Sequence, residues 1–270
     1  MDVRILGPMA VEEQGRSILP TAAKPRQVLA LLALRGDHLV TVPTLTEEIW
    51  GEHPPRSAAT TLQTYILQLR RLIGDALGHG SARSAKDVLV TRPSGYLLAV
   101  SPGTVDAAAF EAAVVQGRRA CAQGDPRATS ELLGRALALW RGPALVDVPV
   151  GPILELDVMA LEEARMAALE HRIEADLNLG LHTQLVGELR VLTRQYPMNE
   201  NLHRQLMTAF YRSGSVWRAL EAYQTLRGTL RDELGLEPSA PVQRLHHAIL
   251  TADPAIEEGD LLLGGDRLAA

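Results

Sequence analysis

The stretch "TTLQTYILQLRRLIG", Thr60–Gly74, decides the fold of the N-terminal part of this chain, because its apolar residues recur at helical spacing. One stripe of the helix is apolar and consists of Leu62, Tyr65, Ile66, Leu69, Leu72 and Ile73. The opposite side carries Thr, Gln and Arg, and no carboxylate occurs between Arg56 and Asp75, although Glu is a common filler of solvated helix faces. The pattern predicts an amphipathic helix whose polar side is suited to a contact other than water.

Two shorter helices are expected before this stretch and a β-hairpin after it. "KPRQVLALLAL", Lys24–Leu34, has proline in its first turn, and "TLTEEIWG" has capping-box spacing between Thr44 and Glu47. "DVLVTRPSGYLLAV", Asp87–Val100, has two β-type runs around a Pro-Ser-Gly turn. "VRILG", "AVEEQG" and "RSILP" indicate short strands near the N-terminus. Three helices followed by a hairpin indicate a winged helix-turn-helix domain.

The rest of the chain is expected to be helical. "SPGT" at 101–104 marks a boundary, which predicts a winged helix-turn-helix DNA-binding domain at 1–100, a helical domain at 106–251 and a frayed tail at 252–270. Gly180 and Gly214 lie 34 residues apart, which is the tetratricopeptide period. The predicted fold class is therefore mainly α with a small α+β part, in which an all-α tetratricopeptide-like domain follows the winged helix.

Charge is unevenly distributed along the chain. The whole sequence carries a net charge of −5, but residues 1–100 hold eleven Lys and Arg against nine Asp and Glu. Between Arg56 and Arg92, six basic residues are accompanied by only two acidic ones. Because a phosphate backbone responds to local basic surface and not to the total charge, this segment is a candidate for DNA binding.

Other classes of protein are disfavoured. No apolar run reaches the roughly 18–20 residues of a membrane span, and the N-terminus lacks a secretory leader, so we expect a cytoplasmic protein without a membrane partner. The single cysteine, Cys121, excludes an internal disulfide, and we expect its side chain to be buried. The histidines are scattered, and no nucleophile elbow, Walker lysine or zinc-protease helix occurs. We therefore expect no enzyme activity, no metal site and no cofactor.

Three motifs in combination carry a family resemblance: the "EEIWGEHPP" turn, the "TYILQLRR" helix and the "GYLL" strand. At this spacing they resemble the winged-helix domain of the Streptomyces antibiotic regulatory proteins, which is related to the OmpR/PhoB type. The helical remainder is similar to the bacterial transcriptional activation domain of that family, and the likeness covers about residues 3–250. The resemblance implies an activator of a secondary-metabolite gene cluster, similar to small pathway-specific regulators of polyketide clusters.

The resemblance also implies which residues contact DNA. Base-facing positions of the recognition helix match Gln63, Thr64, Leu67 and Gln68. Phosphate contacts would come from Arg70 and Arg71, and Arg92 would lie at the wing. The complete expected DNA-binding set is Arg56, Thr60, Thr61, Gln63, Thr64, Leu67, Gln68, Arg70, Arg71, Arg92 and Ser94. Thr and Gln hydrogen-bond base edges or phosphates, and Arg does both.

The family's partners are double-stranded DNA, as direct repeats near promoters, and RNA polymerase with its sigma factor. The loop matching the polymerase-facing segment of related activators consists of Gly51, Glu52, His53, Pro54 and Pro55. Direct repeats favour a second copy bound head-to-tail on the DNA. The alternative is a helical-repeat adaptor whose N-terminal domain binds protein and not DNA.

Overall fold

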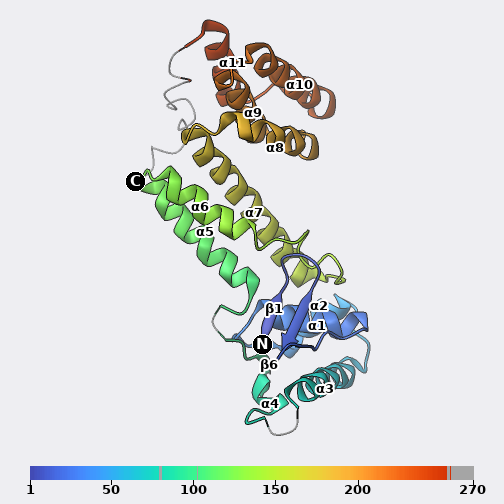
Figure 1. Ribbon diagram of the computed structural model, residues 1–270. Coiled ribbons are helices and arrows are strands. Elements are labelled where there is room, and N and C mark those ends of the chain that lie inside the picture. Colours follow the sequence, from blue (N-terminus) through green and yellow to red (C-terminus); the bar gives the residue numbers. More distant parts are fainter. Residues whose placement is uncertain (79–80, 102, 254–255, 257–270) are drawn as a thin grey trace. The chain divides into compact units, whose positions relative to one another are not determined.

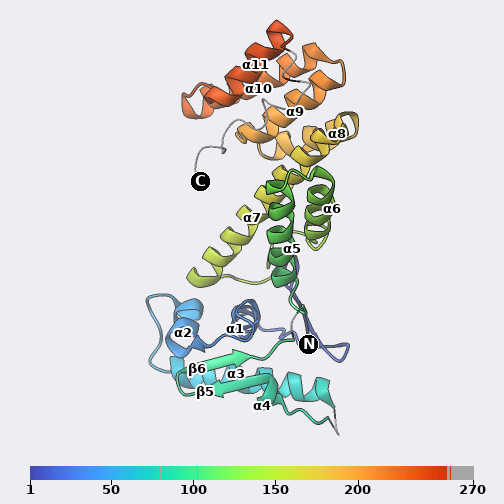
Figure 2. The same ribbon diagram turned by 90° about the vertical axis from the view of Figure 1, so that its left-hand side faces the viewer.

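The structure is a computed structural model that describes residues 1–270 except 79–80, 102, 254–255 and 257–270 (Figures 1 and 2). Most of the tail that we expected to fray from residue 252 lies outside the described residues. The chain divides into two compact units, one of residues 1–115 with 135–167 and the other of residues 116–134 with 168–270. The predicted fold class, a winged helix followed by a helical domain, is confirmed.

The N-terminal elements alternate short strands with helices. They are β1 (Asp2–Arg4), β2 (Ala10–Glu13), β3 (Arg16–Ser17), α1 (Ala23–Leu34), β4 (Val40–Thr41), α2 (Val42–Trp50), α3 (Ala58–Leu77), α4 (Ala85–Val88), β5 (Leu89–Arg92) and β6 (Gly95–Leu98). The helices that follow are α5 (Asp106–Ala122), α6 (Pro126–Leu137), α7 (Pro152–Asn178), α8 (His182–Gln195), α9 (Glu200–Arg212), α10 (Val216–Leu234) and α11 (Ala240–Thr251).

Two antiparallel three-stranded sheets frame the first three helices. One sheet has the order β1-β2-β3, and the other has the order β4-β6-β5. The predicted hairpin is confirmed: Leu89 pairs with Leu98 and Arg92 with Gly95, which leaves a two-residue turn. A Cβ atom at Gly95 would overlap the carbonyl oxygen of Val40 in β4, so only glycine allows the third strand to approach this closely.

The helix-turn-helix differs from the sequence prediction at one helix start. Thr41, and not Thr44, is the N-cap of α2, because the Thr41 hydroxyl accepts a hydrogen bond from the backbone N–H of Thr44 at 3.2 Å. Along α3 the predicted apolar stripe is buried, with Leu62, Ile66, Leu69 and Ile73 at most 2% exposed. The rings of Trp50 and Tyr65 stack with centroids 6.4 Å apart, so α2 and α3 hold a defined angle.

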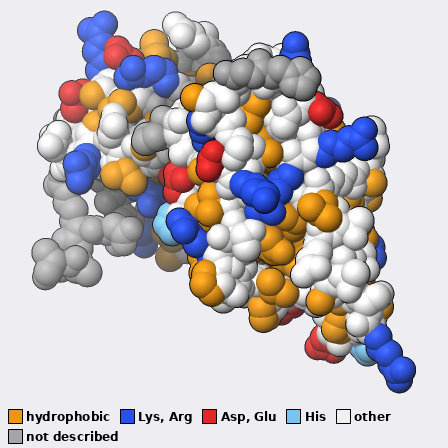
Figure 3. All heavy atoms as spheres, turned by 90° about the horizontal axis from the view of Figure 1, so that it is seen from below, with side chains coloured by type: hydrophobic (Ala, Val, Ile, Leu, Met, Phe, Trp, Pro, Cys, Tyr) orange, Lys and Arg blue, Asp and Glu red, His pale blue; other side chains and the backbone are white. Residues whose placement is uncertain are grey.

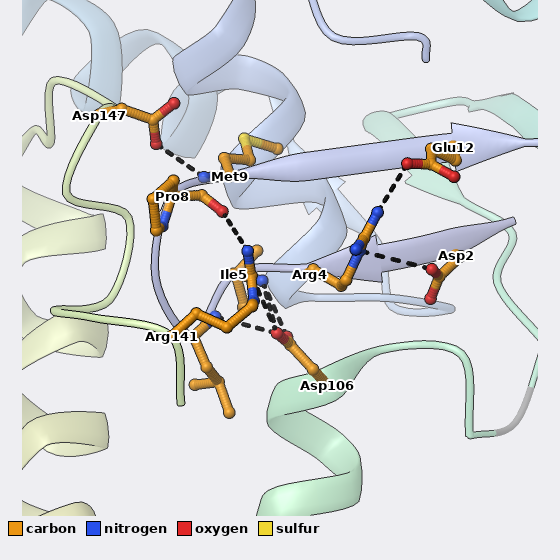
Figure 4. A network of polar contacts seen from close by, with 10 residues as sticks. Asp2, Arg4, Ile5, Pro8, Met9, Glu12, Asp106, Arg141 and Asp147 are labelled. Atoms are coloured by element: carbon orange, nitrogen blue, oxygen red, sulfur yellow. Dashed lines mark hydrogen bonds and ion pairs between the residues drawn. The ribbon is translucent and has the colours of Figure 1, made fainter. Parts of the chain in front are cut away.

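The unit that contains the winged helix continues well past the boundary expected at 101–104. The Asp106 carboxylate accepts hydrogen bonds from the backbone N–H groups of Ile5 and Leu6 at 2.8–3.1 Å (Figure 4). The Asp147 carboxylate accepts from the N–H of Met9 at 2.7 Å. The compact unit therefore takes in the first part of α5 and the loop before α7, whose carboxylates satisfy backbone groups of the N-terminal segment, and it continues into the first part of α7.

A buried carboxylate joins α2 to the start of α7 in the same unit. Glu48 is 1% exposed, and its Oε1 accepts from the backbone N–H of Gly151 at 2.6 Å. Its Oε2 accepts from the N–H groups of Ile153 and Leu154 at 3.0 and 2.9 Å. The Gln27 amide in α1 donates to the same carboxylate at 2.7 Å. Glu48 therefore caps the N-terminus of α7 from within the helix-turn-helix.

The second unit contains the predicted 34-residue repeat. Gly180 and Gly214 both have positive φ and end the turns before α8 and α10. Equivalent positions of the repeat are buried, with Leu185 at 4% exposure, Ala219 at 0% and Tyr223 at 7%. The helices pack as antiparallel neighbours, α8 against α9 and α9 against α10. This is the packing expected of a tetratricopeptide-like array.

Two further observations bear on the sequence analysis. The prediction that Cys121 is buried was wrong, because its side chain lies exposed near the end of α5. None of the described helices is long and apolar enough to span a bilayer.

Candidate nucleic-acid interface

The polar side of α3 is open to solvent along the predicted face. Thr60, Gln63, Thr64, Gln68 and Arg71 are exposed, and Thr61 is half-buried. Leu67 is 65% exposed, so this apolar side chain lies among hydrogen-bonding groups and not in the core. The Thr64 hydroxyl donates to the carbonyl oxygen of Thr60 at 3.0 Å, which leaves its oxygen able to accept. The face offers amide, hydroxyl, methyl and guanidinium groups over several helical turns.

The two adjacent arginines of α3 have different surroundings. The guanidinium of Arg70 donates to the carbonyl oxygen of Leu89 at 3.1 and 2.7 Å and to the Thr91 hydroxyl at 2.6 Å. It therefore ties α3 to β5, and the phosphate contact expected of Arg70 stays a prediction. Arg71 is exposed, and no hydrogen bond or ion pair engages it within the described residues. Of the pair, Arg71 is the one available to a ligand.

The wing is the β5–β6 hairpin, and the contact of Arg70 with β5 helps to hold it in place. Arg92 and Ser94 are exposed at the tip of the hairpin. The carbonyl oxygen of Ser94 accepts from the backbone N–H of Val42 at 3.0 Å, so the tip is held against the start of α2. Through Arg70 and Ser94 the hairpin is bonded to both α2 and α3, which fixes the wing relative to the exposed face of α3.

The N-terminus of α3 and the loop before it are also accessible. No acidic residue occupies the first turn of α3, and the Ser57 side chain makes no capping hydrogen bond. The free N–H groups of such a helix start attract phosphate. In the loop, Glu52, His53, Pro54, Pro55 and Arg56 are exposed and Gly51 is half-buried. The loop leaves α2 through a positive φ of 59° at Gly51, whose N–H donates to Glu47 at 2.7 Å.

The two carboxylates of this region do not interrupt the polar face. Asp87 receives hydrogen bonds from the N–H and hydroxyl of Ser84, both at 2.8 Å, and these bonds hold its pKa below the usual range. Asp75 lies near the far end of α3. Seen from below, basic side chains lie in the middle of this end of the unit, among uncharged and apolar ones (Figure 3).

Sequence reasoning missed some parts of this surface. The Thr91 hydroxyl orients Arg70, and the first turn of α3 has neither a side-chain cap nor an acidic residue. Arg83 and Lys86 were counted in the basic balance but not among the site residues, and both are exposed beside the hairpin. The missing carboxylates in the first turn of α3 were the signal for the helix start, whereas the Arg70–Thr91 contact depends on tertiary packing.

These surroundings predict different results for the two arginines. Arg71→Ala should weaken binding to all DNA sequences alike and lower the slope of log affinity against log salt by about 1, because one phosphate contact is lost. Arg70→Ala should instead lower the free energy of unfolding by about 1–3 kcal/mol, because the carbonyl of Leu89 loses its donor. Salt titrations and urea unfolding of both variants check this. Equal effects of the two changes on stability would contradict the assignment.

Comparison with known proteins extends these observations. Residues 105–250 match the family described as "Bacterial transcriptional activator domain", and residues 15–98 match "Transcriptional regulatory protein, C terminal". The chain is 51% identical to the regulatory protein DnrI of Streptomyces peucetius, over 95% of this chain and 94% of DnrI. It is 34% identical to the transcriptional regulator RedD of Streptomyces coelicolor, over 95% of this chain and 72% of RedD.

One solved structure has a similar fold over nearly the whole of this chain. EmbR of Mycobacterium tuberculosis, solved in complex with a low-affinity phosphopeptide, superposes with a TM-score of 0.86 at 32% sequence identity. The match covers 97% of this chain and 68% of the EmbR chain. The combination of both domain types in one order is thus shared with these proteins.

Proposed function

The chain belongs to the Streptomyces antibiotic regulatory protein family, and on that premise we propose that it binds promoter DNA through α3 and the wing and activates an antibiotic gene cluster. The observation that carries the proposal is the carboxylate-free face of α3, where Gln63, Gln68 and Leu67 lie exposed on a helix with a buried opposite side. Such a helix enters the major groove, where glutamine amides bond adenine and apolar groups contact the thymine methyl.

The phosphate contacts are proposed to surround this helix. Arg56 and the start of α3 lie on one flank, Arg71 on another, and Arg92 with Ser94 at the wing. An arginine at a wing tip is suited to the adjacent minor groove, which attracts Arg through its negative potential. Together these groups would set the register of α3 on the duplex, while the exposed glutamines discriminate between bases.

The loop Gly51–Pro55 is proposed to contact RNA polymerase with its sigma factor. Its side chains beyond Gly51 are exposed, and it leaves α2 next to the start of α3, so it would protrude beside the bound DNA. Two prolines limit its conformational freedom, which lowers the entropy lost on binding a partner.

A single copy carries one recognition helix, so we propose that two copies occupy direct repeats head-to-tail. The repeats would be about one helical turn apart, or roughly 10–11 base pairs, so that both helices enter the same face of the duplex. The adaptor alternative has no observation in its favour, because both family matches are to transcriptional regulators.

Footprinting on promoters of the flanking gene cluster, together with Gln68→Ala, tests the proposal. We expect protected direct repeats, an affinity that falls steeply with salt, and a loss of about 1–3 kcal/mol for Gln68→Ala on the true site but little on random DNA. Gln68→Glu should cost more, because the negatively charged duplex repels a carboxylate. Absence of binding to any cluster promoter at low salt would sink the proposal, and an equal loss on random DNA would refute the role of Gln68.

A further inference from the structure

A groove runs across the helical repeat in the second unit, away from the residues assigned to DNA. It has a volume of about 390 Å³ and is lined from three helices: Arg190, Thr193 and Arg194 of α8, His203, Leu206 and Phe210 of α9, and Trp217, Arg218, Glu221, Ala222 and Thr225 of α10. These helices lie side by side in Figures 1 and 2, with α9 between the other two. The floor therefore comes from α9 and the walls from α8 and α10.

The walls carry basic side chains that form no ion pair with carboxylates among the described residues. Arg190, Arg194 and Arg218 are exposed, and in the part of the chain that the structure describes none of them forms an ion pair. The Arg218 guanidinium instead lies 5.9 Å from the centre of the Phe210 ring and 5.1 Å from that of Trp217. Three arginines around one carboxylate, Glu221, make the groove locally basic within a unit that is acidic overall.

The groove also carries an apolar surface that nothing in the described chain covers. Trp217 is 63% exposed, although an indole of this size is usually packed against protein. Phe210 and Leu206 beneath it are 7% and 5% exposed, so the open apolar surface beside the arginines is mainly the Trp217 indole. Exposed Trp and Arg side chains in one concavity are the residue types that dominate binding energy at protein interfaces.

A buried histidine contributes to the floor of the groove. His203 is only 4% exposed, and neither ring nitrogen makes a hydrogen bond of good geometry, although the carbonyl groups of Pro197 and Ala222 lie near the ring. Burial lowers the pKa of His203, so the ring is neutral and offers one donor and one acceptor. Both ring nitrogens are closed to solvent, so His203 shapes the floor of the groove and does not itself contact a ligand.

We propose that this groove binds an acidic peptide segment of a partner protein, with an apolar residue seated on Trp217 and flanking carboxylates held by the arginines. Guanidinium groups bind carboxylates with charge-assisted, often bidentate, hydrogen bonds. Charge complementarity selects an acidic segment over a basic one. The Glu221 carboxylate on the wall would repel a ligand that bears a phosphate at every residue.

The binding surface can be tested on the full chain with a short fluorescein-labelled peptide in which Glu residues flank a Leu. We expect saturable anisotropy at low salt and a blue shift of tryptophan emission that Trp217→Phe abolishes, because Trp50 and Trp140 lie outside the groove. Arg194→Glu and Arg218→Glu should each weaken binding about tenfold or more. Arg218→Lys should retain part of the affinity. Arg231→Glu, an exposed change on α10 outside the groove, serves as the matched control.

Several outcomes would overturn the proposal. One is that a peptide with Gln in place of Glu binds as tightly as the acidic peptide, and another is that Arg231→Glu weakens binding as much as the groove variants do. The others are that a single-stranded oligonucleotide binds more tightly at the same arginines, or that the acidic peptide does not bind at low salt. Promoter affinity should be unchanged in Arg194→Glu and Arg218→Glu, because the groove shares no residue with α3 or the wing. The DNA assay therefore separates a failure here from a failure of the proposed function.

Discussion

Glu48→Ala is expected to lower the free energy of unfolding by about 3–5 kcal/mol, although the residue lies neither in an apolar stripe nor on the DNA face. The change removes the acceptor for the backbone N–H groups of Gly151, Ile153 and Leu154 and for the Gln27 amide. Glu48 itself is 1% exposed, and its bonds with Leu154 and Gln27 are buried, whereas those with Gly151 and Ile153 are partly buried. Urea unfolding monitored by circular dichroism measures the loss.

The neighbouring carboxylate provides a matched control for this prediction. Glu47 lies on the same helix but is exposed, so Glu47→Ala should change stability by less than about 0.5 kcal/mol. Glu48→Gln keeps the size of the side chain but directs an NH₂ group toward N–H donors, and it should lose most of the same stability. Similar unfolding of Glu47→Ala and Glu48→Ala would show that the cap contributes little.

Removal of residues 106–270 is expected to disrupt the winged helix as well as activation. The fragment 1–105 lacks Asp106 and Asp147, whose carboxylates hold the N–H groups of Ile5, Leu6 and Met9. It also exposes apolar side chains that are fully buried in the whole chain, including Ile5 and Leu6. We therefore expect fragment 1–105 to lose cooperative thermal unfolding and most of its promoter affinity.

A longer fragment separates folding from activation. Fragment 1–167 keeps every residue of the first compact unit, so it should unfold cooperatively and bind the promoter within about threefold of the full chain. Because it lacks residues 168–270, it should fail to activate transcription in a purified polymerase assay. Full activation by either fragment would refute the role of the helical repeat, and a stable, DNA-binding fragment 1–105 would contradict the structural boundary.

Much of the DNA-binding domain could be predicted from sequence because its signals are local. The apolar period of Thr60–Gly74 identified the core side of α3, and the Pro-Ser-Gly turn identified the hairpin. The exposed face of α3 followed from the same period, since a residue opposite a buried stripe faces solvent. The 34-residue spacing of Gly180 and Gly214 likewise indicated the repeat before any packing was known.

Features that the sequence did not reveal depended on contacts between residues distant in sequence. Arg70 and Arg71 are adjacent residues of the same type, so the sequence alone does not distinguish their surroundings. In the structure only Arg70 reaches Leu89 and Thr91 on the hairpin. Cys121 stands in an apolar-rich run, and its exposure reflects which side of α5 has a neighbour. The N-cap of α2 is Thr41 because β4 positions it, although Thr44 has the better local spacing.

The sequence by itself determined the order of the elements, the family and the polar face of α3, because helical and strand periodicity and turn chemistry act over a few residues. Only the tertiary structure decided the limits of the compact units, the separate tasks of the two arginines and the role of Glu48. In each case the deciding force is the need of a buried polar group for a partner. The chain supplies that partner from up to 138 residues away, as in the bond from Met9 to Asp147.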